Sequence, residues 1–255
     1  LLGLDVEVHT GAEGPLVGAQ EFAHEVHGAT GLGSLVLPEP TRGADSDDAV
    51  GWLVETIRAE EGLHLVPIGP LTNVALALRA DPGMAKRVAS ITLMGGAALS
   101  VGNVTAAAEF NVYADPEAAD EVFRSGAPLT MVGLNLTHQV RMGSAHGRVC
   151  ATFGTPVGDA MAELLEFYTT FHVAEEETED GPVHDPCAVL AVTHPHLFEM
   201  ASRPVHVEVA GTHTRGMTVV DERGPRAEGS FNCDVAYDAD ADALIDLVMQ
   251  AVRDA

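Results

Sequence analysis

The sequence predicts an α/β fold: an open, mostly parallel, Rossmann-like sheet with helices on both of its faces. Short apolar segments typical of buried strands alternate along the chain with segments whose apolar residues recur at helical spacing. These strands are apolar along their length, as parallel strands covered on both faces are. The chain shows no internal repeat, low-complexity tract or linker, so we expect a single domain over residues 1–255.

The individual elements follow from apolar runs and the caps and turns that bound them. We expect strands at 6–9, 63–68, 91–94, 129–134, 205–209 and 217–220. We expect helices at 49–62, 71–79, 115–125, 144–179, 186–192 and 240–255. The acidic run from Asp45 to Asp48 invites a metal assignment, but it directly precedes a helical pattern. Acidic residues there cap free N–H groups and complement the helix dipole, so we interpret the run as a cap.

The charge of the chain excludes two classes of partner. Acidic residues outnumber basic ones 38 to 13, which gives a formal charge of −25. Such a surface repels phosphate backbones and anionic lipids, so we expect no nucleic acid and no membrane partner. We hypothesise adaptation to a salt-rich cytoplasm, because a Debye length of about 3 Å at 1 M salt screens this self-repulsion. Unfolding curves with equal stability in low and molar salt would contradict that hypothesis.

The cysteines indicate the compartment. Cys150, Cys187 and Cys233 are too few and too scattered for a disulfide framework or a CxxC metal site. A reducing cytoplasm is therefore the expected location. Cys187 follows a His-Asp-Pro triplet, but a small buried hydrophobe explains it better than a nucleophile does.

The segment from Ser90 to Asn111 is the most informative for function. Its apolar strand ends at two glycines, where the absence of Cβ atoms lets another group approach the backbone. The loop that follows carries Asn103, Glu109 and Asn111, and loops at the carboxyl ends of parallel strands bind ligands. Amides and a carboxylate suit a ligand with several hydroxyls. Composition alone favours a plainer interpretation, in which the amides cap turns and Glu109 is solvated.

Other polar residues are open to two interpretations. His184 and Asp185 precede a proline that starts a helix, and by itself such an aspartate is an ordinary N-cap. The aromatic residues of 167–172, which include Tyr168 and His172, have the helical spacing of core packing. His27 is, on its own, a surface histidine.

Seven strings in one order resemble the inosine/uridine-preferring nucleoside hydrolase family. They are HGATGLG at 27–33, VPIGPLTNVALAL at 66–78, the broken string MGG…GN…AAEFN…DPEAA over 94–119 (counted as one), MVGLNLTHQV at 131–140, PVHDP at 182–186, TRGMTVVD at 214–221 and NCDVAYDAD at 232–240. The match is collinear and covers nearly the whole chain. Each string alone is weak evidence, whereas seven in family order are strong.

The resemblance implies the nucleoside hydrolase fold and hydrolysis of the N-glycosidic bond of a ribonucleoside to ribose and free base. It implies that the enzyme uses Ca²⁺ and forms a homodimer or homotetramer. Residues that match the family's ribose contacts are Met94, Asn103, Glu109 and Asn111. Residues that match its base contacts are His27, Tyr168 and His172.

The resemblance also implies roles for three further residues. His184 matches the histidine that protonates the leaving base, and Asp185 matches a catalytic, metal-ligating carboxylate. The backbone carbonyl of Ile68 matches another metal ligand, although any side chain would allow that role. Histidine suits a general acid because its ordinary pKa lies near neutrality.

One part of the family pattern is missing. Family members begin with a strand and a DTDxGxDD loop, which supplies most of the calcium site and the general base, and no string here matches it. We therefore expect an N-terminally incomplete member of the family. The alternative is a truncated, catalytically inactive protein that binds nucleosides. A generic nucleotide-binding module is disfavoured, because no GxGxxG or P-loop opens a βα unit.

Overall fold

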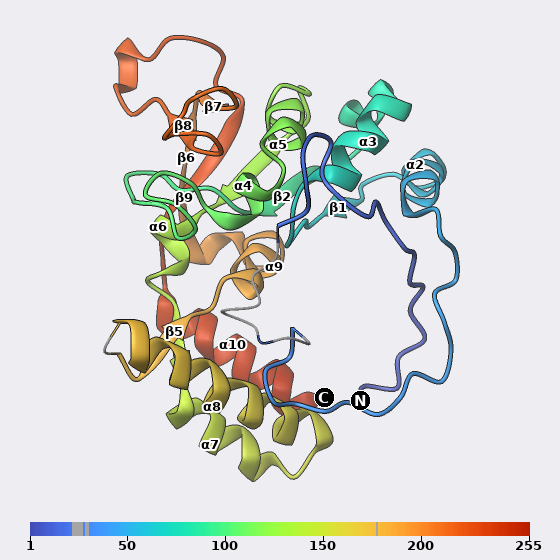
Figure 1. The fold of residues 1–255 in the computed structure, drawn as a ribbon, viewed down its shortest axis with the longest axis vertical. Coiled ribbons are helices and arrows are strands. Elements are labelled where there is room, and N and C mark those ends of the chain that lie inside the picture. Colours follow the sequence, from blue (N-terminus) through green and yellow to red (C-terminus); the bar gives the residue numbers. More distant parts are fainter. Residues whose placement is uncertain (22–27, 29–30, 177) are drawn as a thin grey trace.

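The protein is built around one five-stranded sheet (Figure 1). The computed structural model describes residues 1–21, 28, 31–176 and 178–255, with the side chains of 171–176 left out. The strand order is β1–β2–β3–β9–β6, and all neighbours are parallel except β6, which runs antiparallel to β9. The bounds are β1 His64–Leu65, β2 Ser90–Met94, β3 Leu129–Val132, β6 Phe198–Arg203 and β9 Cys233–Ala239. The predicted open, mostly parallel sheet is confirmed.

Helices cover both faces of this sheet. Ile91 and Leu93 of β2 pack into a core with α2 (Ala49–Ala59), α3 (Thr72–Ala80) and α5 (Pro116–Phe123). Met94 belongs to a second core, which α9 (Asp185–Thr193) and α10 (Ala241–Asp254) help to form. Alternate side chains of a strand point to opposite faces, so β2 supplies apolar side chains to both cores.

The helical region after the sheet differs from its prediction. The sequence predicts one helix over 144–179, whereas the structure has α7 (Ser144–Cys150), a short 3-10 turn (Ala151–Phe153) and α8 (Pro156–Glu176). Gly154, with a φ of +68°, makes the break, because this left-handed conformation ends a helix and favours glycine. A β-ladder of β4 (Arg141–Gly143) and β5 (Asp180–Pro182) joins the far ends of the two helices.

Short elements complete the fold. A small antiparallel pair, β7 with β8, lies beside α5 and the loop that follows β2. Their bounds are β7 Val205–Val207 and β8 Thr218–Val220, and the remaining helices and turns are α4 Phe110–Ala114, α6 Leu134–Thr137, Pro82–Lys86, Pro195–Leu197 and Gly224–Arg226. Among the described residues, none of the helices combines the length and apolar character needed to cross a membrane.

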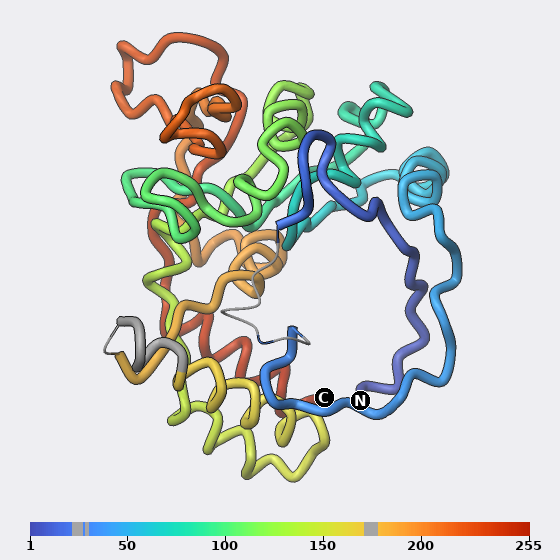
Figure 2. Tube along the Cα trace, in the orientation of Figure 1, coloured from blue at the N-terminus to red at the C-terminus, as the bar shows by residue number. Residues whose placement is uncertain are grey.

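The beginning of the chain corrects one prediction and confirms another. Residues 1–21 and 31–48 lie outside the sheet (Figure 2), and the strand expected at 6–9 is wrong. In that range only His9 forms a bridge, to Ser46, and the hydrogen bonds on either side of it join Val8 to Asp45 and Thr10 to Ser46. The predicted cap is confirmed: the Asp48 carboxylate accepts a hydrogen bond of 2.7 Å from the Gly51 N–H at the start of α2.

Candidate functional site

A cavity of about 660 Å³ opens where β1 and β2 end. This volume lies in the ordinary range for small-molecule sites. Its lining comes from the 31–33 loop, the end of β1, the segment from β2 to α4, α8, and the turn from β5 into α9. The polar residues among the lining are Asn103, Glu109, Asn111, Tyr168, His184 and Asp185, and the apolar ones include Ile68, Met94, Leu164 and Phe167.

Glu109 lies buried in this cavity wall, at the start of α4. Its Oε1 accepts a hydrogen bond from the N–H of Asn111, and its Oε2 accepts from the N–H groups of Val112 and Gly96, all at 2.9–3.1 Å. Only 3% of Glu109 is exposed, so the interpretation that it is a solvated acid is wrong. Burial raises the pKa of Glu109 to about 7, the three N–H donors oppose that rise, and the nearby charge of Asp185 adds to it.

The two amides of this segment stabilise the loop and line the cavity at the same time. Asn111 Nδ2 donates to the Met94 carbonyl at 3.0 Å and lies 3.4 Å from the Met94 sulfur. Asn103 Oδ1 accepts from the Phe110 N–H at 2.9 Å. The turn-capping role that composition favours is therefore present, and the same residues lie where a ligand would reach them.

His184 and Asp185 lie across the cavity from β2, at the start of α9. Nδ1 of His184 shares a hydrogen bond of 2.8 Å with the hydroxyl of Thr137, which is fully buried at the end of α6. The ring of His138 packs at a tilt, 5.9 Å from that of His184. His184 occupies the cap position and Asp185 is the first helical residue, so Asp185 is not the N-cap that an isolated motif predicts.

Of the remaining predicted site residues, two line the cavity and two fall outside the part that the structure describes. Tyr168 lines the cavity from α8, and its hydroxyl donates to the Pro182 carbonyl at 3.1 Å. Ile68 lies just beyond β1, half exposed, and lines the same cavity. His27 and the side chain of His172 lie outside the described residues.

A calcium ion would need more oxygen atoms than this arrangement provides. Ca²⁺ takes six to eight oxygen ligands. The Asp185 carboxylate and the Ile68 carbonyl are oxygen donors of the right kind at one cavity, but they are few. In the part of the chain that the structure describes, no three His, Cys, Asp or Glu side chains come together as a metal site. The described residues therefore fit calcium in chemistry and fall short in number.

Sequence reasoning missed two features of the site. Phe167 and Leu164 line the cavity, although the aromatic spacing on this helix indicates core packing. Thr137 contacts His184, which lies 47 residues later in the chain. Its position at the exit of a predicted strand is the only signal for it in the sequence, and that signal does not specify a partner.

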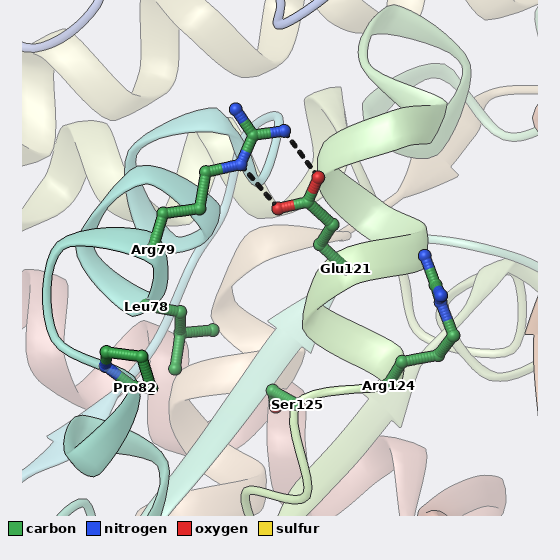
Figure 3. A pocket seen from close by; sticks show the side chains of 6 residues that line it. All are labelled: Leu78, Arg79, Pro82, Glu121, Arg124 and Ser125. Carbon is green, nitrogen blue, oxygen red and sulfur yellow. Dashed lines mark hydrogen bonds and ion pairs between the residues drawn. The ribbon is translucent and has the colours of Figure 1, made fainter.

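A smaller hollow of about 280 Å³ lies between the last turns of α3 and α5 (Figure 3). Its charged groups are engaged with one another: Arg79 forms a two-pronged ion pair with Glu121, and Arg124 pairs with Asp120. The Arg79 guanidinium lowers the pKa of Glu121, which stabilises the charged carboxylate. Each charged side chain that lines this hollow therefore already has an ionic partner.

Comparison with known proteins gives one consistent result. The family profile described as "Inosine-uridine preferring nucleoside hydrolase" matches residues 1–246. The pyrimidine-specific ribonucleoside hydrolase RihA of Enterobacter sp. (strain 638) is 41% identical over 248 residues, which are 96% of this chain and 79% of the relative. The protein of the same name from Shewanella woodyi is 40% identical over 251 residues, 98% of this chain and 80% of the relative.

Two solved structures are also similar. The purine-preferring ribonucleoside hydrolase from Gardnerella vaginalis superposes with a TM-score of 0.84 at 31% identity, covering 90% of this chain and 73% of that one. An inosine-guanosine nucleoside hydrolase gives a TM-score of 0.83 at 27% identity, covering 98% and 81%.

Proposed function

This chain belongs to the inosine-uridine preferring nucleoside hydrolase family and is a nucleoside hydrolase, and from that premise we propose that the cavity at the end of β2 is its active site. There water cleaves the N-glycosidic bond of a ribonucleoside and releases ribose and free base. One observation supports this assignment above the others. Glu109 and Asp185, 76 positions apart in the sequence, line one cavity together with two amides and a histidine.

The ribose end of the site is formed by Asn103, Glu109 and Asn111, with Met94 packed under the sugar ring. Amide and carboxylate groups bond sugar hydroxyls as donors and acceptors. Cleavage builds positive charge on the ribosyl ring, and a fixed carboxylate stabilises charge that develops nearby. Two backbone segments orient the carboxylate of Glu109, so little reorganisation is needed when that charge forms.

The base end is formed by His184 and Tyr168, to which we add His27 and His172 as proposed contacts. His184 acts as the general acid that protonates the departing base, and Thr137 holds its ring in position. We propose a pyrimidine ribonucleoside as the preferred substrate. The support is that the relatives at about 40% identity are named pyrimidine-specific, whereas the two solved structures described above, at 31% and 27% identity, are named for purines or purine nucleosides.

We propose that the site binds Ca²⁺, with the Asp185 carboxylate and the Ile68 carbonyl among its ligands. When bound, such an ion would supply positive charge that holds water and ribose hydroxyls. Titration calorimetry with Ca²⁺ tests this: Asp185→Ala should weaken binding, and equal affinity in both proteins would contradict it. Light scattering tests the proposed homodimer or homotetramer, and fractionation of the source cells tests the cytoplasmic location.

The decisive experiment measures ribose release and nucleoside binding on the same protein. We expect uridine and cytidine to release ribose with a higher kcat/KM than inosine. The variants Glu109→Gln and His184→Gln should lower kcat/KM by about 100-fold or more, because each removes a group that acts in the transition state. Calorimetric binding of uridine without release would support a nucleoside-binding protein instead. A protein that fails both to bind uridine and to release ribose would refute the assignment of this cavity.

A further inference from the structure

We propose that Thr218 is a positioning residue, which fixes the carboxylate of Glu109 through the backbone of Gly96 and Ala97. The inference rests on the proposed function, in which Glu109 holds the sugar. Thr218 lies on β8, in the small antiparallel ladder outside the main sheet, and it does not line the cavity. It acts on the site through the loop that follows β2.

The Thr218 hydroxyl makes two hydrogen bonds to one residue of that loop. Its Oγ1 accepts from the Ala97 N–H and donates to the Ala97 carbonyl, both at 2.8 Å. Thr218 is only 4% exposed, and 121 residues separate the partners in sequence. A hydroxyl is the side-chain group that can donate and accept at one atom, so it holds both polar groups of this residue in one geometry.

The neighbouring residue, Gly96, carries this geometry to Glu109. Gly96 has a φ of +72°, and a Cβ there would lie 2.7 Å from the Thr218 methyl carbon and 2.9 Å from the Met131 sulfur. The backbone is therefore pressed against Thr218 in a conformation that favours glycine. From this position the Gly96 N–H donates to Oε2 of Glu109 at 2.9 Å.

That bond differs from the other two that Glu109 accepts. The N–H groups of Asn111 and Val112 belong to the helix that Glu109 itself caps. Their hydrogen bonds to Glu109 therefore form whenever this helix forms. The Gly96 N–H comes from a separate segment, so it ties the carboxylate to the sheet. The Leu134 N–H holds the Gly96 carbonyl at 2.9 Å on one side of this donor, and the Thr218 hydroxyl holds Ala97 on the other. Without that hydroxyl, the loop loses its hold on the Ala97 side.

A second clamp fixes the following residue of the loop. Asn135 Oδ1 accepts from the Ala98 N–H at 3.0 Å, and its Nδ2 donates to the Ala236 carbonyl at 2.8 Å. The β7–β8 segment also packs directly on α4, since a Cβ on Gly216 would lie 2.9 Å from the Tyr113 Cα. The β7–β8 segment thus contacts both segments that donate to Glu109, which are the loop after β2 and the helix α4.

The test uses Thr218→Val, which keeps the shape of the side chain and removes the hydroxyl, and Thr218→Ser, which keeps the hydroxyl. We expect Thr218→Val to lower kcat/KM for uridine about tenfold, with a higher KM because Glu109 holds the sugar and a lower kcat because Glu109 also faces the developing charge. Thr218→Ser should stay within about twofold of wild type. Thr72→Val is the matched control. It also removes a buried hydroxyl bond, of 2.7 Å to Asp115, and should lower the unfolding midpoint without a change in KM.

Coupling to Glu109 separates a positioning role from a structural one. In a Glu109→Ala background, Thr218→Val should lower kcat/KM by less than about twofold, because the group that it positions is gone. A full, additive loss there would overturn the inference, as would an unchanged KM in the single variant.

Amide hydrogen exchange tests the same inference without measuring enzyme activity. The Gly96 and Ala97 amides should exchange about tenfold faster or more in Thr218→Val, and at the wild-type rate in Thr72→Val. Equal exchange in Thr218→Val and wild type would overturn the inference. If wild type releases no ribose, the proposed function fails, while these exchange rates still decide the role of Thr218.

Discussion

Glu109 and Glu121 are the same residue type in opposite surroundings. Glu109 is buried at the cavity with backbone N–H donors and a second acid nearby, and its pKa is raised to about 7. Glu121 lies on α5 against Arg79, partly exposed, and its pKa is lowered (Figure 3). A carboxylate buried without a cation destabilises the fold, so such a group persists where function requires it. An exposed ion pair contributes little to either stability or function.

The largest expected effect that separates these two acids is on catalysis. Glu109→Gln should lower kcat/KM for ribose release by about 100-fold or more, because in the proposed function the carboxylate bonds the sugar and faces its developing charge. Glu121→Gln, the matched control in the exposed pair, should leave kcat/KM within about twofold. The measurement is steady-state ribose release with uridine. Similar losses in both variants would mean that Glu109 acts through the fold rather than at the site.

The next effect is a pH dependence of stability that belongs to Glu109 alone. Its pKa rises from an ordinary 4.5 to about 7 on folding. Stability from this group is therefore fully present below pH 4.5 and is lost as the pH rises through 7. The loss is about 3 kcal/mol, at 1.36 kcal/mol for each pKa unit.

Urea unfolding with a calcium chelator and molar salt measures this dependence. The free energy of unfolding of wild type should fall, relative to that of Glu109→Gln, between pH 4.5 and pH 7.5. For Glu121 the sign is reversed and the pH window lies lower, because its pKa is lowered from 4.5. Wild type should lose stability relative to Glu121→Gln only as the pH falls below 4.5, and the two curves should run parallel between pH 4.5 and pH 7.5. Parallel curves for wild type and Glu109→Gln would show that the folded protein does not perturb this carboxyl.

The same contrast separates what the sequence could predict from what it could not. The apolar segment 91–94 and the helices on either side follow from periodicity, because one strand supplies both cores. Glu109 reads as a solvated acid from composition, since its burial depends on Gly96 and Asp185, which local pattern does not bring together. The family resemblance placed it in the predicted site. Strand β9 was not predicted because Asp234 and Asp238 interrupt its apolar residues, so the local pattern hides a central strand that pairs with β3 and β6.

A smaller effect is expected at Thr137, which bonds His184, the proposed general acid. Thr137→Val removes the hydroxyl that bonds Nδ1 of His184 and should lower kcat about tenfold with little change in KM, because binding of the sugar does not use this bond. Thr137→Ser retains the hydroxyl and should restore most of the activity. Steady-state kinetics with uridine measures both constants. A rise in KM at unchanged kcat would instead place His184 in substrate binding.

The smallest effect is expected at the hollow between α3 and α5. Arg79→Gln removes the partner of Glu121, but more than half of the Arg79 side chain is exposed, so solvent already screens this pair. We expect an unfolding midpoint close to that of wild type and unchanged kinetics for uridine. Arg79→Gln with Glu121→Gln should behave like either single variant. A loss of activity from Arg79→Gln would show that this edge of the molecule is coupled to the cavity, and the separation between the two acids would then not hold.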